Sequence, residues 1–514
     1  MTSPWPHIEV TPSGGSQDLD AAEKGVYDNT QSLATLPPLA DPKKTMIHSE
    51  SFLSPMSPLH EGITPSSSVP VLSLSPSPEK QANKAAVPEI GPLRRRWILF
   101  QLWFNTYRKF FTFVTMLNLA GIIMASLSRF PYAEKHLGAL VLGNLLTAIL
   151  MRNELFLRCL YTIAIYGLRS WAPVSIKLAA TSVLQHVGGV HSGCAISGAA
   201  WLVFKVVDII RHRNIQPSAV IATGIVTNLM IIISVLSAYP WVRNYHHNVF
   251  EGYHRFIGWL GLAATWSFVI LGNQYDLNEG RWRANANSLI STQELWFAVF
   301  MTVFVLIPWC TLRKVNVEVE VPSPKVAVLR FDRGIQQGLL GRISRTSIME
   351  YHAFGIISEG RHSPYHYMIC GVQGDFTKSL VADPPKAVWT REMKFAGVGH
   401  ASAMFKRGIR ICTGTGIGAA LSTCIQDPNW FLIWIGSDQE KTFGPTIAGL
   451  IHNNIPPERM ILWDSKQRGG RPDTMQLLKE TWDSFGAEVI FITSNMKGND
   501  EMMQGCRAVT DLDT

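Results

Sequence analysis

Hydrophobic residues gather in six long segments in the middle of the chain, and polar residues separate these segments. The six segments cover residues 110–128, 137–151, 194–210, 218–238, 254–272 and 294–310. A helix needs roughly 17–25 apolar residues to cross a bilayer, and all but the short second segment reach that length. The pattern therefore predicts an α-helical membrane bundle of about six spans.

Basic residues predict how these spans are oriented. With six spans, most of the flanking Lys and Arg fall on the side of the two termini, beginning with Arg94–Arg96. Because cytosolic loops carry the excess of Lys and Arg, we predict that both termini are cytosolic, in the plasma membrane or an endomembrane. Charged residues and Pro173 interrupt residues 155–193, which we interpret as interfacial helices on the cytosolic side.

The pattern changes after Lys314, where short alternating segments replace the long apolar ones. Residues 315–320 read VNVEVE and residues 325–331 read KVAVLRF, and such alternation is typical of half-buried strands. From Ile409 onward, apolar strands alternate with helices, which is typical of a parallel α/β sheet. The pattern thus predicts an antiparallel β-barrel followed by an α/β domain.

The first 93 residues have a different composition, rich in Ser, Pro and Thr, and are predicted to be disordered. Their Ser-Pro pairs resemble sites of proline-directed kinases, although a solvated tail without that role is the alternative. The predicted parts are a tail at 1–93, a transmembrane helical domain at 94–312, a β-barrel at 313–405 and an α/β domain at 406–514.

Composition supports the membrane interpretation. Hydrophobic residues make up 47% of the chain, charged residues only 16%, and the mean hydropathy is +0.11, values that favour a membrane protein. The Lys and Arg residues that give the net charge of +8 are scattered beside hydrophobic segments. Membrane lipid is therefore the expected partner rather than nucleic acid. The seven cysteines form no CxxC pair, which predicts neither a disulfide framework nor a metal site.

The strongest chemical signal is the glycine-rich run CTGTGIGAA, from Cys412 to Ala420. It follows the apolar stretch Gly408–Ile411 and precedes a predicted helix at Ala419–Ile425. Glycines at such a place let backbone amides approach a pyrophosphate at a helix N-terminus. The run alone is a weak signal, and its position behind a membrane domain strengthens it.

The order of six spans, a β-barrel and a glycine-loop domain resembles the ferric reductase and NADPH oxidase superfamily. The segments QHVGGVHSGCA and HNVFEGYHRFIGW look like those of fungal TmpA-type integral membrane oxidoreductases, which are related to the membrane tails of some adenylate-forming proteins. The resemblance covers residues 95–505, and we expect no adenylation domain within the chain. It implies a ferredoxin reductase-like module with FAD and a nicotinamide cofactor.

In that superfamily a His-Pro-Phe-Thr-like strand binds the flavin, and YHAFGIIS at residues 351–358 resembles it. Gly355 replaces the usual hydroxyl residue, so one hydrogen bond to the isoalloxazine is missing or comes from the backbone. The segment GDFTKSL at residues 374–380 resembles the one that contacts the flavin pyrophosphate. Two ordinary strands and a turn are the alternative. The flavin contacts implied by the resemblance are His352, Phe354, Ser358, Thr377 and Lys378.

The resemblance also implies a nicotinamide site. Its residues are Gly414, Thr415, Gly416, Ile417, Gly418 and Arg471. Arg471 lies in RGGRPD, where it could pair with a phosphate or remain a solvated loop residue. Ser437 is compatible with a 2′-phosphate and Asp438 would repel one, so NADPH stands only modestly ahead of NADH. The ending CRAVTDLDT lacks the aromatic terminus of many relatives, so the final segment differs or the sequence is truncated or mis-spliced.

Transmembrane reductases of this superfamily hold two haems with paired histidines about 13–14 residues apart, near the two leaflets. Counting that far from His191 or His254 reaches no histidine, so we expect no haem, or at most one bridged by these two residues. If residues 248–253 are helical, His247 and His254 share a helix face. The three histidines then form a possible haem or substrate site at the inner membrane face.

Lys205 lies inside a predicted span, three residues before Asp208. That separation permits a same-face pair, although a lysine that reaches out to the interface is the simpler explanation.

These features predict a membrane-anchored FAD-dependent NAD(P)H oxidoreductase. Electrons would pass to a small or lipophilic acceptor at the cytosolic membrane face, and we assign no catalytic side chain. Transmembrane electron transfer through haem to ferric ion or oxygen is one alternative. A non-catalytic membrane sensor or scaffold that retains the reductase fold is the other.

Overall fold

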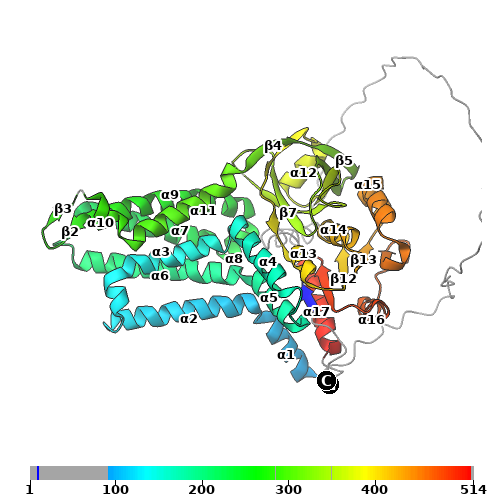
Figure 1. Ribbon diagram of the computed structural model, residues 1–514, viewed down its shortest axis with the longest axis horizontal. Coiled ribbons are helices and arrows are strands. Elements are labelled where there is room, and N and C mark those ends of the chain that lie inside the picture. The colour runs from blue at the N-terminus through cyan, green and yellow to red at the C-terminus, as the bar shows by residue number, and fades with distance from the viewer. Residues whose placement is uncertain (1–7, 11–90, 284, 349, 511–514) are drawn as a thin grey trace, which may run out of the picture. The chain divides into compact units, whose positions relative to one another are not determined.

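The computed structural model describes residues 8–10 and 91–510, except residues 284 and 349. It contains a helical part and two large sheets with their own helices (Figure 1). The Ser-Pro pairs, like nearly all of the predicted tail, lie outside the described residues. One short strand within that tail, β1 (Ile8–Val10), is described, and the sequence pattern did not predict it.

The helical part comprises eleven of the described helices and one small hairpin. The helices are α1 (Pro92–Trp103), α2 (Thr106–Ser126), α3 (Pro131–Leu150), α4 (Glu154–Leu168), α5 (Val174–His186), α6 (Gly188–Arg211), α7 (Ser218–Ser237), α8 (Pro240–Tyr245), α9 (His247–Gln274), α10 (Ala286–Ile290) and α11 (Gln293–Cys310). The hairpin strands β2 (Tyr275–Asp276) and β3 (Arg281–Trp282) connect α9 to α10.

Among the described residues, five helices are long and apolar enough to cross a membrane. They are α2, α6, α7, α9 from Phe250 onward, and α11, and each coincides with a predicted apolar segment. The second predicted span corresponds instead to α3 and α4, which together qualify as a sixth candidate but are bent by 72°. Asn153 lies at this bend, and its side chain accepts a hydrogen bond from the amide of Phe156 at 3.0 Å, which starts α4 afresh.

Glycines let α6 pack closely against its neighbours. A Cβ on Gly189 would lie 2.1 Å from the carbonyl oxygen of Tyr107 in α2, and one on Gly193 would lie 2.9 Å from Val114 Cβ. Small residues are the usual means by which membrane helices approach one another. The glycines of the QHVGGVHSGCA segment therefore have a packing role.

A polar contact joins three of the helices. Asn118 Oδ1 on α2 accepts hydrogen bonds from Asn144 Nδ2 on α3 and from Trp201 Nε1 on α6, both at 2.9 Å. Such bonds between apolar helices fix their register. The described bundle is thus held by close packing together with a few directed polar contacts.

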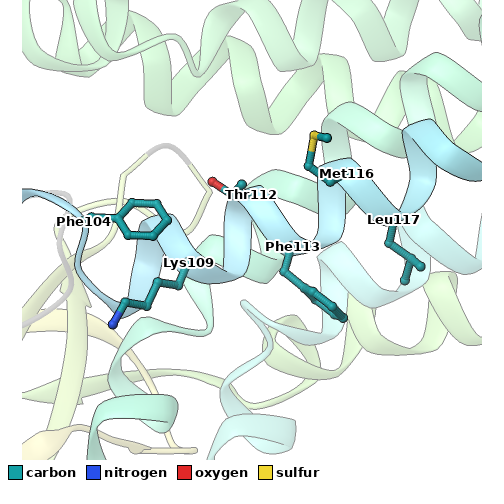
Figure 2. A pocket seen from close by; sticks show the side chains of 6 residues that line it. All are labelled: Phe104, Lys109, Thr112, Phe113, Met116 and Leu117. Carbon is teal, nitrogen blue, oxygen red and sulfur yellow. The ribbon is translucent and has the colours of Figure 1, made fainter.

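The outward face of α2 is apolar. No residue of α2 is buried, and Phe113, Met116 and Leu117 are each more than half exposed. Figure 2 shows these side chains lining a hollow at the elbow between α1 and α2, with Lys109 at the elbow itself. An exposed apolar surface of this kind is expected of a helix that contacts lipid.

A curled antiparallel sheet follows α11, and it has the order β4-β10-β7-β8-β9-β6-β5, with β11 paired to β7. Its edge strands β4 and β5 are consecutive and separated only by Val317, so the sheet has to curl to bring its edges together. The helix α12 (Asp375–Ala382) follows β9. The strands are β4 (Leu312–Asn316), β5 (Glu318–Ser323), β6 (Val326–Asp332), β7 (Leu339–Ser344), β8 (His352–Ile357), β9 (Tyr365–Gly371), β10 (Ala387–Arg391) and β11 (Phe395–Ala396).

The last part contains a parallel sheet of order β1-β15-β12-β13-β14, as the alternation of strands and helices predicted. Its remaining elements are α13 (Val398–Ala401), β12 (Gly408–Thr413), α14 (Ile417–Gln426), β13 (Trp430–Gly436), α15 (Gln439–Asn454), β14 (Met460–Asp464), α16 (Thr474–Phe485), β15 (Val489–Thr493) and α17 (Met496–Thr510). β1 adds to the edge beside β15, with Glu9 opposite Phe491. Backbone pairing alone can do this, which is why composition did not signal it.

A buried ion-pair cluster joins α4 to the curled sheet. Glu154 Oε1 is 2.6 Å from Arg342 Nε on β7 and 2.9 Å from Arg391 Nη1 on β10. The Glu154 side chain is only 5% exposed. The Arg391 guanidinium also lies over the rings of Trp309 and Tyr351, at 5.0 and 4.9 Å. Since one buried carboxylate offsets two guanidinium charges, its loss leaves them uncompensated.

We expect Glu154→Gln to lower the free energy of unfolding by about 3 kcal/mol, because it breaks a buried pair while leaving its partners in place. Thermal unfolding of the detergent-purified chain measures this. Glu318→Gln is the matched control, since Glu318 also pairs with an arginine, Arg330, but is 74% exposed; it should cost less than about 1 kcal/mol. Equal effects of the two substitutions would contradict the role given to Glu154.

Candidate functional site

The glycine loop lies at the carboxyl end of β12. Residues Gly414–Gly416 form a 3₁₀ turn, and α14 begins at Ile417. Gly414 has a φ of +49°, a conformation that favours glycine, and a Cβ on Gly416 would lie 2.6 Å from the carbonyl oxygen of Thr493. The loop geometry therefore requires these two glycines, and the first amides of α14 are donors of the kind that bind phosphate.

This loop also lies where the order of the parallel strands changes direction. β13 and β14 extend from one side of β12, whereas β15 pairs with the other side. Ligands of such sheets bind beyond the carboxyl ends of the strands at this switch point. The hydroxyl oxygens of Thr413 and Ser494, 2.5 Å apart, join the ends of β12 and β15 there. The structure thus brings the predicted residues Gly414–Gly418 to the ligand-binding edge of the sheet.

The predicted flavin strand packs directly against the glycine loop. A Cβ on Gly355 of β8 would lie 2.6 Å from the carbonyl oxygen of Gly418 and 2.7 Å from Ala419 Cα. A second close approach lies beside it, since a Cβ on Gly371 of β9 would be 2.8 Å from Thr415 Cγ2. The space that a hydroxyl side chain would need at position 355 is therefore filled by α14.

Two of the predicted flavin residues face α12 from β8. The ring of His352 stacks on that of Phe376, with centroids 4.2 Å apart, and Phe354 lies 6.3 Å from the same ring. His352 Nε2 is 3.1 Å from a carboxylate oxygen of Glu350, and this hydrogen bond holds the pKa of Glu350 below its ordinary value. The structure thus brings His352 and Phe354 together with the start of α12.

The hydroxyls predicted to contact flavin are engaged within the protein. Thr377 Oγ1 accepts hydrogen bonds from the amides of Gln373 and Gly374, at 3.0 and 3.1 Å. Ser358 is fully buried at the far end of β8, where its Oγ accepts from the amide of Ile335 at 3.0 Å. Thr377 therefore shapes the N-terminus of α12, whereas Ser358 holds a turn of the curled sheet. Lys378, by contrast, is 65% exposed.

Charges at the end of β13 bear on the choice of nicotinamide cofactor. Lys466 Nζ lies 2.5 Å from Asp438 Oδ2, so the carboxylate expected to repel a 2′-phosphate is paired with a lysine. Ser437 beside it is exposed. Arg471 is exposed in the loop after β14, one strand farther out along the same edge. The partner Lys466 comes from that loop, 28 residues after Asp438, which is why the sequence pattern missed it.

The predicted membrane-face histidines lie on α6 and α9. Nδ1 of His191 is 2.8 Å from the carbonyl oxygen of Ala148, and Nδ1 of His254 is 3.0 Å from that of Ser234. A carbonyl can only accept, so each Nδ1 carries the hydrogen and each Nε2 is left as an acceptor. The side chain of His247 lies outside the described residues.

One buried group in this region was not predicted. Arg410, on β12, is completely buried, and its Nη2 donates to the carbonyl oxygen of Ala419 at 2.6 Å. This hydrogen bond stabilises the first turn of α14 against β12. Burial raises the pKa of the Cys412 thiol at the start of the glycine run, so this thiol stays protonated and is no nucleophile.

The two cofactors implied by the sequence fit these residues unequally. The glycine loop offers the first amides of α14 and open space at Gly414, where no described atom lies within 4 Å of an added Cβ. The start of α12 offers similar amides at Asp375–Thr377. Amide donors are therefore present for the pyrophosphate of each cofactor. The place where a flavin ring would lie, however, is next to His352, and Phe376 already stacks on that ring.

Two curated proteins are similar to this chain. Adenylate-forming reductase 06235 and adenylate-forming reductase 03009, both of Coprinopsis cinerea, are each 29% identical to it, over 411 and 408 residues. Each alignment covers 78% of this chain but 39% of the relative, so the chain spans about two fifths of these proteins. Because each alignment spans more than 400 of the 514 residues, it includes α6–α11 and the curled sheet whatever its starting residue.

A family model for the C-terminal domain of adenylate-forming reductase 03009 matches residues 398–510, which contain α13 to α17. Among solved structures, the flavohemoglobin from Malassezia yamatoensis with bound FAD and heme is 12% identical. The similarity covers 70% of this chain and 98% of that chain, with a TM-score of 0.29. A TM-score this low carries no conclusion about this chain.

We expect Gly355→Ser to destabilise the protein by about 1–3 kcal/mol, as overpacking usually does, instead of restoring a flavin contact. The reason is the 2.6 Å separation between the added Cβ and the Gly418 carbonyl oxygen. Thermal unfolding and flavin titration test this together. Gly449→Ser in α15 is the control, since a Cβ there meets only Asn453 Nδ2, at 4.0 Å. Tighter flavin binding with unchanged stability in Gly355→Ser would overturn this interpretation.

Proposed function

We propose that this chain is a membrane-anchored FAD-dependent NAD(P)H oxidoreductase related to the ferric reductase and NADPH oxidase superfamily. The similarity to two proteins named as reductases supports an oxidoreductase. Five or six candidate spans among the described helices support the membrane anchor. Both termini are proposed to be cytosolic, in the plasma membrane or an endomembrane, with the two sheets on that side.

The observation that carries the proposal is the contact of β8 with the first turn of α14, at Gly355 and Gly418. A flavin held along β8 and α12 would lie beside a nicotinamide held at residues 414–418. FAD, when bound, accepts a hydride and releases electrons, and the protein supplies orientation and electrostatics. His352 and Phe354 would orient the flavin ring, and the amides at the start of α12 would hold its pyrophosphate.

The choice between the two nicotinamides depends on Asp438. A free carboxylate at this position would favour NADH, because it repels a 2′-phosphate and binds a ribose hydroxyl. The ion pair with Lys466 lowers that repulsion and brings a positive charge to the same edge. NADPH is therefore our proposed cofactor, and NADH would bind more weakly.

The proposed acceptor site lies at the inner ends of α6 and α9, near His191 and His254. Arg255, which follows His254, donates to the carbonyl oxygen of Ile348 at 2.8 Å, so α9 touches the loop that leads into β8. A small or lipophilic acceptor bound there would stand near the flavin strand. Neither His191 nor His254 is followed by a histidine 13–14 residues later, so we propose no haem, or at most one.

One observation favours a second candidate, a non-catalytic sensor or scaffold that retains the fold. The ring of Phe376 covers His352, and the hydroxyls of Ser358 and Thr377 are engaged within the protein. In a protein that no longer binds flavin, these contacts would simply close the site.

We expect Gly416→Ala to raise the KM for NADPH at least about tenfold, since a methyl group 2.6 Å from the Thr493 carbonyl oxygen displaces the loop. Bound flavin should remain. Anaerobic reduction kinetics and the flavin-to-protein ratio measure the two effects separately. Gly449→Ala is the control and should behave as wild type. Unchanged NADPH kinetics would place the nicotinamide elsewhere.

Replacing His191 and His254 with Gln should slow turnover with a lipophilic quinone at least about tenfold. The reason is that the hydrogen bonds between the two imidazole rings and the acceptor are lost. Flavin reduction by NADPH should keep its wild-type rate. His212→Gln is the control, since His212 is exposed at the C-terminal end of α6. Quinone turnover that is equal in all three proteins would contradict an acceptor site at these histidines.

A further inference from the structure

A cavity of about 270 Å³ lies inside the helical bundle, apart from the glycine loop and from the histidines. It is at the end of the bundle where α3, α7 and α11 begin and where α6 and α9 end. Figure 1 shows α10 and the β2–β3 hairpin at the same end. The opposite end of α11 leads into β4 and the sheets. In the predicted orientation this end faces away from the cytosol.

The charged groups of Lys205 and Glu294 both lie next to one glycine of this cavity. A Cβ on Gly138 of α3 would lie 2.8 Å from Lys205 Nζ on α6 and 2.7 Å from Glu294 Oε1 on α11. Lys205 therefore turns into the bundle, where its Nζ is 5.6 Å from the centre of the Phe268 ring, and does not reach out to the interface. Among the described residues, no ion pair within 4.0 Å joins Lys205 to Glu294.

The rest of the cavity has a mixed lining, in which Glu134, Lys135 and Asp208 lie beside apolar side chains. Its walls include Leu202, Phe268 and Val269, all of which are buried. Thr227 and Thr265 also line it, but their hydroxyls donate to carbonyl oxygens of their own helices, at 2.7 Å each. The cavity thus combines charged side chains of both signs with an apolar wall.

We propose that this cavity binds a small zwitterion with an apolar body, of the chemical class of a free α-amino acid with a large apolar side chain. Its carboxylate would pair with Lys205 and its ammonium group with Glu294, while the side chain fills the apolar part. Charged groups inside a bundle are costly unless they are paired, and such a ligand adds an oppositely charged partner to each of the two side chains. The volume lies just below the range of drug-sized sites, about 300–1,000 Å³, which suits a molecule of this size.

Gly138 belongs to the same site, because a larger residue would occupy the place of the two charged heads. Neither the glycine loop nor the flavin strand takes part. The binding site is therefore independent of the proposed electron transfer, and it would be present in a non-catalytic protein as well.

Calorimetric titration of the full chain in lipid nanodiscs tests the proposal with three probes that share one apolar body. They are L-phenylalanine, phenethylamine, which lacks the carboxylate, and 3-phenylpropionate, which lacks the ammonium group. We expect L-phenylalanine to bind at least about tenfold more tightly than either analogue, since each analogue lacks one of the two charged groups that would contact Lys205 and Glu294. No binding of L-phenylalanine, or equal binding of all three probes, would overturn the proposal.

Substitutions in the cavity test which side chain contacts which group of the ligand. Lys205→Met should abolish the preference for L-phenylalanine over phenethylamine, and Glu294→Gln should abolish its preference over 3-phenylpropionate. Gly138→Ala should weaken all zwitterion binding at least about tenfold. Lys109→Met, at the elbow of α2 outside the cavity (Figure 2), is the control and should bind as wild type. Binding that Lys205→Met leaves unchanged would contradict the assignment of the carboxylate.

Discussion

Between Gly355 of β8 and Gly418 of α14 there is no room for one methyl group, and the candidate site depends on this contact. It holds the phosphate-binding turn of the parallel sheet against the strand that resembles a flavin strand. Gly371 and Thr415 repeat the close approach one strand away, and Arg410 braces α14 from the other side. Because backbone meets backbone here, the two sheets cannot slide past each other without breaking the site.

Glycines also permit close packing in the helical part. Gly189 and Gly193 let α6 lie against α2, and Gly138 leaves room for the heads of Lys205 and Glu294. At the end of the bundle that adjoins the curled sheet, Glu154 ties α4 to β7 and β10 through two arginines. Charged clusters therefore lie at both ends of the described bundle, with apolar packing between them.

Local pattern was enough to predict five of the long apolar helices, most of the strands and the glycine loop, because each of these signals lies within one short segment. The reason for Gly355 was not visible, since it depends on Gly418, 63 residues later. Lys205 was expected to reach the interface because Glu294, whose carboxylate lies near the Lys205 ammonium group, is on another helix. Asp438 was expected to repel phosphate because Lys466 follows in a distant loop. Side-chain partners brought together only by the fold escaped prediction, and these partners decide the chemistry.

The absorbance spectrum of the detergent-purified full chain, recorded before and after anaerobic addition of NADPH, tests the central claim most directly. A flavin band that bleaches on addition, with no haem Soret band, is the result that the contact between β8 and the glycine loop predicts. A spectrum without a flavin band, after the protein has been supplied with FAD, would contradict it and leave the fold as a scaffold.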